Sequence, residues 1–403
     1  MDRTPVTDFA TDFDHCDPGF VADPYPVYDE LRQHCPVAHT DRYHGVWIPT
    51  RYKDLAAIAH DHNNFSSHTI LVSELAESPH ELGFHAPPIT EDPPYHTEMR
   101  RLLLPAFSPA VIAAYEPITR QIARDLIASF AGRGTCDAAK DYAQHIPIKV
   151  IALMLGVSGN DSVLFTNWIH RLIEESPLAG EAAFDTIFEV AEYLTGHVEA
   201  HRVEPQDDII THLLESTHDD GSALTDEEII GVCILLLLAG IDTTWSAIGA
   251  ALWHLAQHPD DRQRLSADPS LMTTATEEFL RVFAPVTMAR EVANDTVVAG
   301  CPMKQGDRVL LPFPSGNRDP DAFDDPDRVV LDRAVNRHFA FGVGIHRCLG
   351  SNLARMELRV ALEEWLAVIP DFDLTEPASV TWSAGQVRGP RTLPFAFPIS
   401  AAS

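Results

Sequence analysis

One cysteine in a glycine-containing segment constrains this chain more than any other feature of its sequence. Residues 341–350 read Phe-Gly-Val-Gly-Ile-His-Arg-Cys-Leu-Gly, and the two glycines before the cysteine allow a tight turn and a close approach of the backbone to a flat group. Apolar residues follow at helical spacing: Leu349, Leu353, Met356 and Val360. Cys348 is therefore predicted to lie just before a helix N-terminus, where free amides and the helix dipole favour a thiolate over a thiol.

The chemistry of Cys348 has four interpretations at this point. It could be an inert buried residue, as lone cysteines usually are. It could bind zinc, but no second cysteine or clustered histidine pair stands nearby at ligand spacing. It could belong to a dinucleotide-binding loop, but Arg347 occupies the position where GxGxxG requires glycine. Last, its thiolate could ligate haem iron and donate the electron density that favours O–O cleavage.

The ten residues resemble, position for position, the haem-ligand signature of bacterial cytochromes P450. The resemblance runs from about Asp23 to Pro390, and it implies the family's mainly α fold with small β-sheets. It also implies b-type haem between two long helices, with Cys348 as the axial ligand of the iron. Further contacts to the haem are expected from four small or aromatic residues: Phe341, Gly342, Gly350 and Ala239.

A second motif, Glu278-Phe279-Leu280-Arg281, places an acid and a base three residues apart on one face of a predicted helix. Taken alone, such a pair is best interpreted as a solvated ion pair worth a few tenths of a kcal/mol. The resemblance implies instead the family's buried Glu–Arg pair, with Arg328 as its third member. The family usually has an aromatic residue after that arginine, whereas this chain has Val329.

A third motif lies in the longest predicted helix, which begins at a capping box formed by Thr225 and Glu228. Its apolar run leads into Asp242 and Thr243, polar residues that are costly in mid-helix unless they have a partner or a purpose. A solvated helix face is one interpretation. The family resemblance implies another, in which Thr243 holds oxygen by a hydrogen bond, Asp242 controls proton delivery and Gly240 permits a local widening of the helix.

Four cationic or imidazole side chains suit a pair of haem propionates. His96 and Arg100 stand four residues apart, so they reach the same side of a helix. Arg290, and His346 beside the cysteine, complete the set that the resemblance assigns to the propionates. Two other histidine pairs, His197/His201 and His254/His258, have metal spacing without a third ligand, and we interpret them as solvated helix faces.

Composition limits the remaining possibilities. The chain has 403 residues, with 29 Lys and Arg against 59 Asp and Glu, so its formal net charge is −30. Such acidity disfavours binding to nucleic acid or to anionic lipid. The six cysteines show no disulfide framework, and the apolar run from Ile229 to Ile241 is too short to span a bilayer. We expect a cytoplasmic protein with residues 1–403 in a single domain and no fused reductase.

Periodicity gives a coarse map of the elements. Helices are expected from Tyr95 to about Trp253, with breaks near 132–134, 156–159 and 219–221, and a last helix over 352–368. Short strands are expected at 46–48, 296–299, 308–311 and 392–397.

The resemblance implies a haem-thiolate monooxygenase that inserts one atom of O2 into a small, mostly apolar organic substrate, by hydroxylation, epoxidation or dealkylation. Six residues are expected to line its pocket: Leu235, Leu238, Ala239, Val286, Thr287 and Met288. The loop over 66–90 is expected to carry specificity. Alternatives are a peroxide-driven peroxygenase of the same fold and a non-catalytic haem sensor or electron carrier.

Electrons are expected from a separate ferredoxin and its reductase. A cluster of basic residues near the cysteine predicts a positively charged docking face for an acidic electron donor. The residues are Arg101, Arg337, His338, His346, Arg347, Arg355 and Arg359.

Overall fold

The computed structural model describes residues 4–75, 80–81, 83–174 and 182–399. Helices make up 54% of the chain. The longer ones are α2 (Tyr25–His34), α3 (Tyr52–His60), α4 (Tyr95–Leu103), α5 (Pro109–Phe130), α6 (His145–Leu155), α7 (Ser162–Ile169), α9 (Ala182–Val203), α11 (Asp226–Gln257), α12 (Pro259–Ala267), α13 (Met272–Val282) and α15 (Ser351–Val368). The short ones are α1 (Pro18–Ala22), α10 (Ile209–Glu215) and α14 (Phe313–Gly316).

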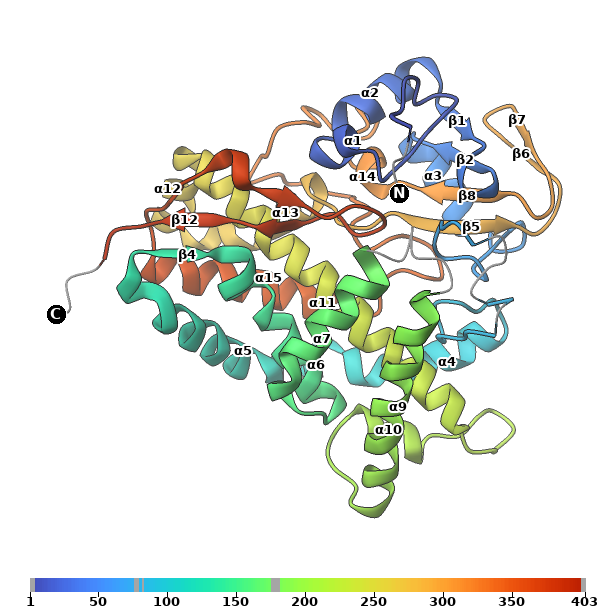
Figure 1. The fold of residues 1–403 in the computed structure, drawn as a ribbon, viewed down its shortest axis with the longest axis horizontal. Coiled ribbons are helices and arrows are strands. Elements are labelled where there is room, and N and C mark those ends of the chain that lie inside the picture. The colour runs from blue at the N-terminus through green and yellow to red at the C-terminus, as the bar shows by residue number, and fades with distance from the viewer. Residues whose placement is uncertain (1–3, 76–79, 82, 175–181, 400–403) are drawn as a thin grey trace.

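The strands form small sheets that join early and late parts of the chain (Figure 1). The largest has the order β1-β2-β8-β5-β3, from Val37–Thr40, Val46–Pro49, Arg308–Leu311, Met288–Val292 and Phe65–Ser66. A second combines β4 (Thr135–Asp137), β12 (Pro394–Ala396) and β9 (Asp373–Leu374). Two hairpin-like pairs are β6 (Thr296–Val298) with β7 (Cys301–Met303), and β10 (Thr381–Trp382) with β11 (Pro390–Thr392).

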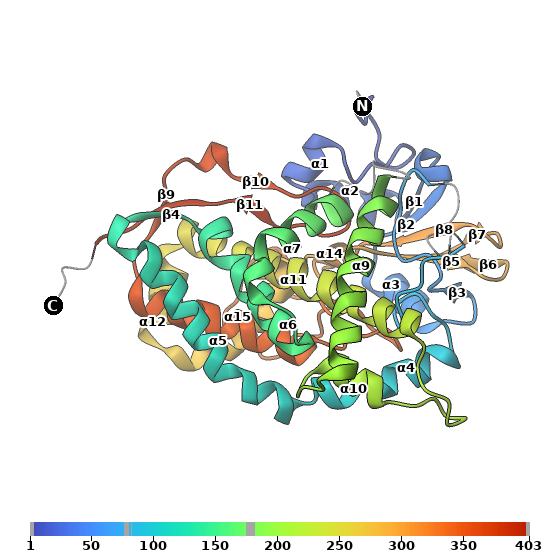
Figure 2. The ribbon, with the colours of Figure 1, turned by 60° about the horizontal axis from the view of Figure 1, so that its bottom comes forward.

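Helix α11 runs through the centre of the helical part, as both ribbon views show (Figures 1 and 2). It packs against α6, α9 and α15. The capping box predicted at its N-terminus is present, because Thr225 and Glu228 bond to each other's backbone amides. The helix as a whole is long and apolar enough to cross a membrane, but 67% of its most apolar window is buried inside the fold, as expected for a core helix. Residues Tyr95–Phe107 and Pro109–Arg133 are together also long and apolar enough, but they are bent by 48° at the break between them.

The strands predicted at 46–48, 296–299 and 308–311 agree with β2, β6 and β8 to within one residue, whereas the helical region predicted from Tyr95 to about Trp253 has more breaks than expected and contains strand β4. Strand β8 and the last helix match closely, while the strand expected at 392–397 is divided between β11 and β12. The break predicted at 156–159 falls at Gly156, which ends α6 in the left-handed conformation with φ 80°. A Cβ atom there would lie 2.1 Å from Asp208 and 2.7 Å from Nε2 of His201. Glycine is therefore required both by the backbone conformation and by the lack of space for a side chain.

The interpretation of the histidine pairs as solvated faces was wrong for one member of each pair, whereas His258 is exposed and His197 is partly exposed. His201 and His254 are almost fully buried, at 2% and 4% exposure. His201 bonds Asp208, the N-cap of α10, at 2.9 Å, and His254 bonds Asp261 at the same distance. One histidine of each pair therefore ties a helix to the element that follows it, through a carboxylate seven residues further along the chain.

Candidate active site

The cysteine loop is held by backbone hydrogen bonds directly before α15. The amide of Cys348 donates to the carbonyl of Phe341 at 2.8 Å, which closes residues 341–348 into a compact turn. Gly344 adopts φ 78°, and a Cβ there would lie 2.2 Å from the carbonyl oxygen of Ala59 in α3. The loop is thus pressed against α3, and α15 begins three residues after the cysteine, as the sequence predicted.

Cys348 is accessible to solvent and also closely surrounded by protein. Because of the surrounding protein, desolvation raises the pKa of its thiol. The amide of Gly350 and the guanidinium groups of Arg100, Arg347 and Arg355 act in the opposite direction and favour the thiolate. A cation bound to the sulfur would remove the desolvation cost that these groups only partly offset.

The middle of α11 also keeps accessible surface. Ala239 is exposed, and Leu235, Leu238 and Thr243 keep part of their surface, although they lie in a helix that is otherwise mostly buried. The hydroxyl of Thr243 donates to the carbonyl of Ala239 at 2.8 Å. The helix is continuous here and does not show the expected widening.

The structure gives Gly240 a packing role. A Cβ on this residue would lie 3.1 Å from the side chain of Ile151, so glycine lets α11 approach α6.

Asp242 is fully buried and paired with an arginine that the sequence did not point to. Its Oδ1 accepts a hydrogen bond of 2.6 Å from Nη2 of Arg391 in β11. Arg391 also donates to Oγ of Ser246 at 3.1 Å, and its guanidinium lies 4.3 Å from the ring centroid of Trp245. The acid is therefore fixed in place beside Thr243 by a residue 149 positions away.

The four residues assigned to the propionates come together. The rings of His96 and His346 are 4.2 Å apart. Burial and the charge of Arg100 lower the pKa of His96 to about 4, and burial with Arg290 lowers that of His346 to about 2. Burial also lowers the pKa of Arg290 to about 10.

This group has more donors than acceptors. Within the described part of the chain, both ring nitrogens of His96 are buried without a hydrogen-bond partner, and so is Nδ1 of His62, a residue that the sequence did not point to. Nη1 of Arg290 donates to the carbonyl of the adjacent Ala289, at 2.7 Å. Unpaired buried donors around a positive centre are what a site for carboxylate groups requires, so these residues fit haem propionates.

The Glu–Arg pair is buried, with both side chains at 0% exposure. Arg281 donates to Glu278 at 2.8 and 2.9 Å. The third member predicted from the sequence was wrong: Nε of Arg333 lies 3.0 Å from Glu278, whereas the side chain of Arg328 is 75% exposed and faces Asp325 at 3.6 Å. Only the backbone carbonyl of Arg328 takes part, as an acceptor for Arg281.

Glu278 has further partners that the sequence did not reveal. It also accepts hydrogen bonds from Nδ2 of Asn336 at 3.0 Å and from the amide of Val330 at 2.8 Å. The carboxylate of Glu278 is therefore one of the groups through which α13 anchors the segment before the cysteine loop, together with Arg281 and Glu277.

We expect Arg333→Ala to lower the free energy of unfolding by about 2–3 kcal/mol, because it removes a buried charge-assisted contact to Glu278. Arg328→Ala is the matched control and should change the free energy by less than about 0.5 kcal/mol, as for exposed ion pairs. Denaturant titration of both variants measures the difference. A larger loss for Arg328→Ala would contradict the arrangement described here.

The predicted docking cations are mostly neutralised by ion pairs. Arg355 and His338 both contact Glu277, at 2.6 and 3.2 Å. Arg359 contacts Glu116 at 2.5 Å, and Arg101 contacts Asp219. His346 is largely enclosed. Arg337 and Arg347 are exposed, so the positive face is smaller than the sequence suggested.

The residues expected to line the pocket after α13 divide into two groups. Val286 and Met288 keep accessible surface. Thr287 is buried, and its side chain bonds to Tyr28 of α2, so the structure removes it from the pocket lining.

Comparisons with known proteins agree with this fold. The family model described as Cytochrome P450 matches residues 43–272 and 267–376. The chain is 36% identical to the Vitamin D(3) 25-hydroxylase of Pseudonocardia autotrophica over 364 residues, which cover 88% of each protein. Among solved structures, it is similar to the cytochrome P450 PksS of the bacillaene polyketide synthase from Bacillus subtilis, with a TM-score of 0.87, 29% identity and coverage of 96% and 99%. It is also similar to CYP109E1 from Bacillus megaterium in complex with testosterone, with a TM-score of 0.86, 31% identity and coverage of 94% and 98%.

Proposed function

The chain belongs to the cytochrome P450 family and is a cytochrome P450 monooxygenase, and from this premise we propose that it oxygenates a compact, mostly apolar organic molecule of the size of a steroid or terpenoid. The observation that carries the proposal is the accessible apolar surface of α11 at Leu235, Leu238 and Ala239. Relatives that act on vitamin D3 or bind testosterone support the same class of substrate.

The family implies a haem-thiolate cofactor, and we propose haem b. Cys348 would bind its iron, while His96, Arg100, Arg290 and His346 would hold its propionates. When bound, the haem supplies the activation of O2 that no side chain can perform. Phe341, Gly342 and Gly350 would lie along the thiolate side.

Asp242 and Thr243 would hold and deliver the protons that the reaction of O2 requires. The hydroxyl of Thr243 donates its hydrogen to a carbonyl within its own helix, and its oxygen remains able to accept a hydrogen bond from a proton donor. Asp242 is buried one residue away and is held by Arg391. A positioned carboxyl and hydroxyl at this spacing form a short path from the protein to the reacting oxygen.

Electrons would come from a separate acidic ferredoxin and its reductase in the cytoplasm. The exposed side chains of Arg337 and Arg347 flank the cysteine loop and give such a donor a positive surface on the thiolate side. A peroxygenase would have less use for an acid and alcohol that handle protons, and a sensor would need neither. The Asp242–Thr243 pair therefore favours the monooxygenase.

The test is a library of steroids, terpenoids and fatty acids added to the haem-loaded enzyme. We expect at least one polycyclic compound to shift the iron's spin state at micromolar concentration and to be converted to a singly oxygenated product with ferredoxin, reductase and reduced nicotinamide cofactor. Incorporation of one atom from labelled O2 identifies the reaction. Product formed only when hydrogen peroxide is added would establish the peroxygenase instead.

A further inference from the structure

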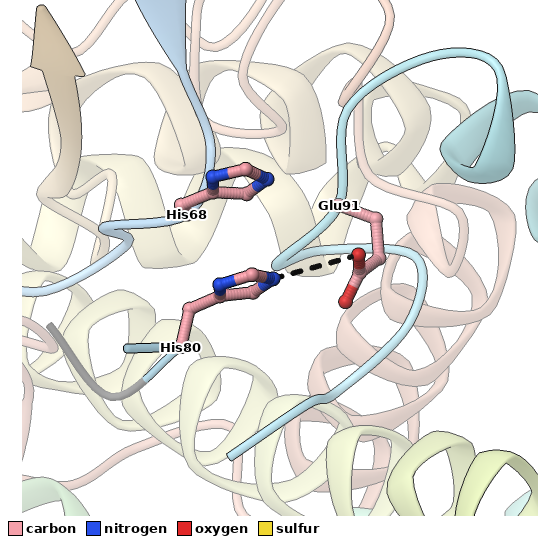
Figure 3. Close-up of side chains that lie close together, drawn as sticks. All are labelled: His68, His80 and Glu91. Carbon is pink, nitrogen blue, oxygen red and sulfur yellow. Dashed lines mark ion pairs between the residues drawn. The ribbon is translucent and has the colours of Figure 1, made fainter. Parts of the chain in front are cut away.

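Three metal-ligating side chains converge at a place that the proposed oxygenation does not use. Figure 3 shows the imidazoles of His68 and His80 one above the other, with the carboxylate of Glu91 beside them. One ligand atom from each residue lies within 4.8 Å of the other two. All three residues belong to the segment between β3 and α4.

The contacts within this cluster leave it without strong internal bonds. Nε2 of His80 is 3.8 Å from Oε2 of Glu91, and Nε2 of His68 is 3.8 Å from Oδ2 of Asp92. Both distances are too long for hydrogen bonds. The two imidazole rings are stacked, with centroids 4.0 Å apart and planes inclined by 10°.

Positive charge on both rings would be unfavourable in this stack. Burial lowers the pKa of His80, and the neighbouring His68 and His85 lower it further. Neutral imidazole is the form that binds a metal. Glu91 is itself buried, at 7% exposure, and its Oε1 already accepts from Thr90 at 2.9 Å and contacts His85 at 3.2 Å. Its Oε2 is left facing His80.

We propose that His68, His80 and Glu91 bind a divalent transition metal, with Zn²⁺ as the best match. Two imidazoles with one carboxylate suit zinc, whereas calcium and magnesium prefer oxygen ligands alone. Bonds of about 2.0–2.2 Å place the ligand atoms of a tetrahedral zinc site about 3.3–3.6 Å apart. At least one of the two imidazole rings must turn out of the stack to bind the ion, because nearly parallel rings cannot both direct a nitrogen lone pair at one point. The side chains of His68 and His80 are 43% and 22% exposed, which leaves room for that rotation.

The metal would tie this segment to the active site. Asp92, next to Glu91, accepts from Oγ of Ser66 at 2.6 Å and from the amide of Ser67 at 3.0 Å. Oγ of Ser67 lies 2.8 Å from Nε2 of His346, one of the proposed propionate ligands. Bound zinc would thus restrain a segment that contacts the haem pocket, and it would do so without taking part in the oxygenation.

The experiment is calorimetric titration of Zn²⁺ into the haem-loaded enzyme after treatment with a chelator. We expect one Zn²⁺ per chain, and at least a tenfold loss of affinity in both His68→Ala and His80→Ala. His218→Ala is the matched control. Its two ring nitrogens face different carboxylates, Glu98 and Glu228, each at 3.2 Å, so this histidine should not contribute to the site.

Two further measurements test whether each variant is folded and which ligands hold the metal. An unchanged haem spectrum and melting temperature in metal-free buffer would show that each variant is folded. The zinc absorption edge should indicate two imidazole ligands. No saturable binding, or equal affinity in wild type and both histidine variants, would overturn the proposal.

Discussion

Replacement of Cys348 by serine is expected to abolish the strongly red-shifted Soret band of the reduced carbon monoxide complex and to reduce oxygenation to background. The red shift depends on a thiolate ligand, and a serine hydroxyl cannot take that role at neutral pH. Absorbance of the reduced enzyme under carbon monoxide measures the first effect, and product formation measures the second.

The other cysteines provide the controls. Burial raises the pKa of Cys136 and of Cys233 to about 12, so both remain thiols at neutral pH. Cys301 lies on β7, in the sheet rather than at the cysteine loop. Cys301→Ser should therefore keep the thiolate band and most of the activity. A normal band in Cys348→Ser would mean that another ligand holds the iron.

Features encoded by neighbouring residues could be predicted from the sequence. The helix start after Cys348 and the capping box of Thr225 and Glu228 depend on spacings of a few residues. Both are formed as predicted, because residues only a few positions apart can adopt few other arrangements relative to each other. The buried histidines were missed although a local signal existed, since an aspartate follows each of them by seven residues.

Partners from distant parts of the chain could not be predicted in this way. The dipeptide Asp-Arg occurs both at 327–328 and at 332–333, and nothing local decides which arginine reaches Glu278. The structure decides it, because the backbone carbonyl of Arg328 bonds Arg281 and its side chain then points outward. The partner of Asp242 was even harder to predict from the sequence, because the packing of β11 against α11 is what brings Arg391 to Asp242.

The contact between Asp242 and Arg391 predicts distinct defects on the proton path. Asp242→Asn should slow turnover about 100-fold, the usual contribution of a positioned acid or base. Thr243→Ala should still consume reductant and O2 but release hydrogen peroxide in place of product. Reductant, peroxide and product are measured together with a substrate that shifts the spin state.

Arg391 acts through Asp242 and is a positioning residue. Arg391→Gln should lower turnover about tenfold, because the carboxylate of Asp242 loses a charge-assisted hydrogen bond that fixes it. Arg391→Lys keeps the charge and should restore most of the rate. Ser246→Ala is the matched control, since it removes another contact of the same guanidinium and leaves the bond to Asp242 intact.

A solvent isotope effect separates positioning from a general loss of structure. If Arg391 orients the acid, Arg391→Gln should increase the solvent deuterium effect on turnover, because proton delivery then limits the rate. A variant that is merely less stable would lose active enzyme without changing that effect. Equal isotope effects in wild type, Arg391→Gln and Asp242→Asn would therefore remove both residues from the proton path.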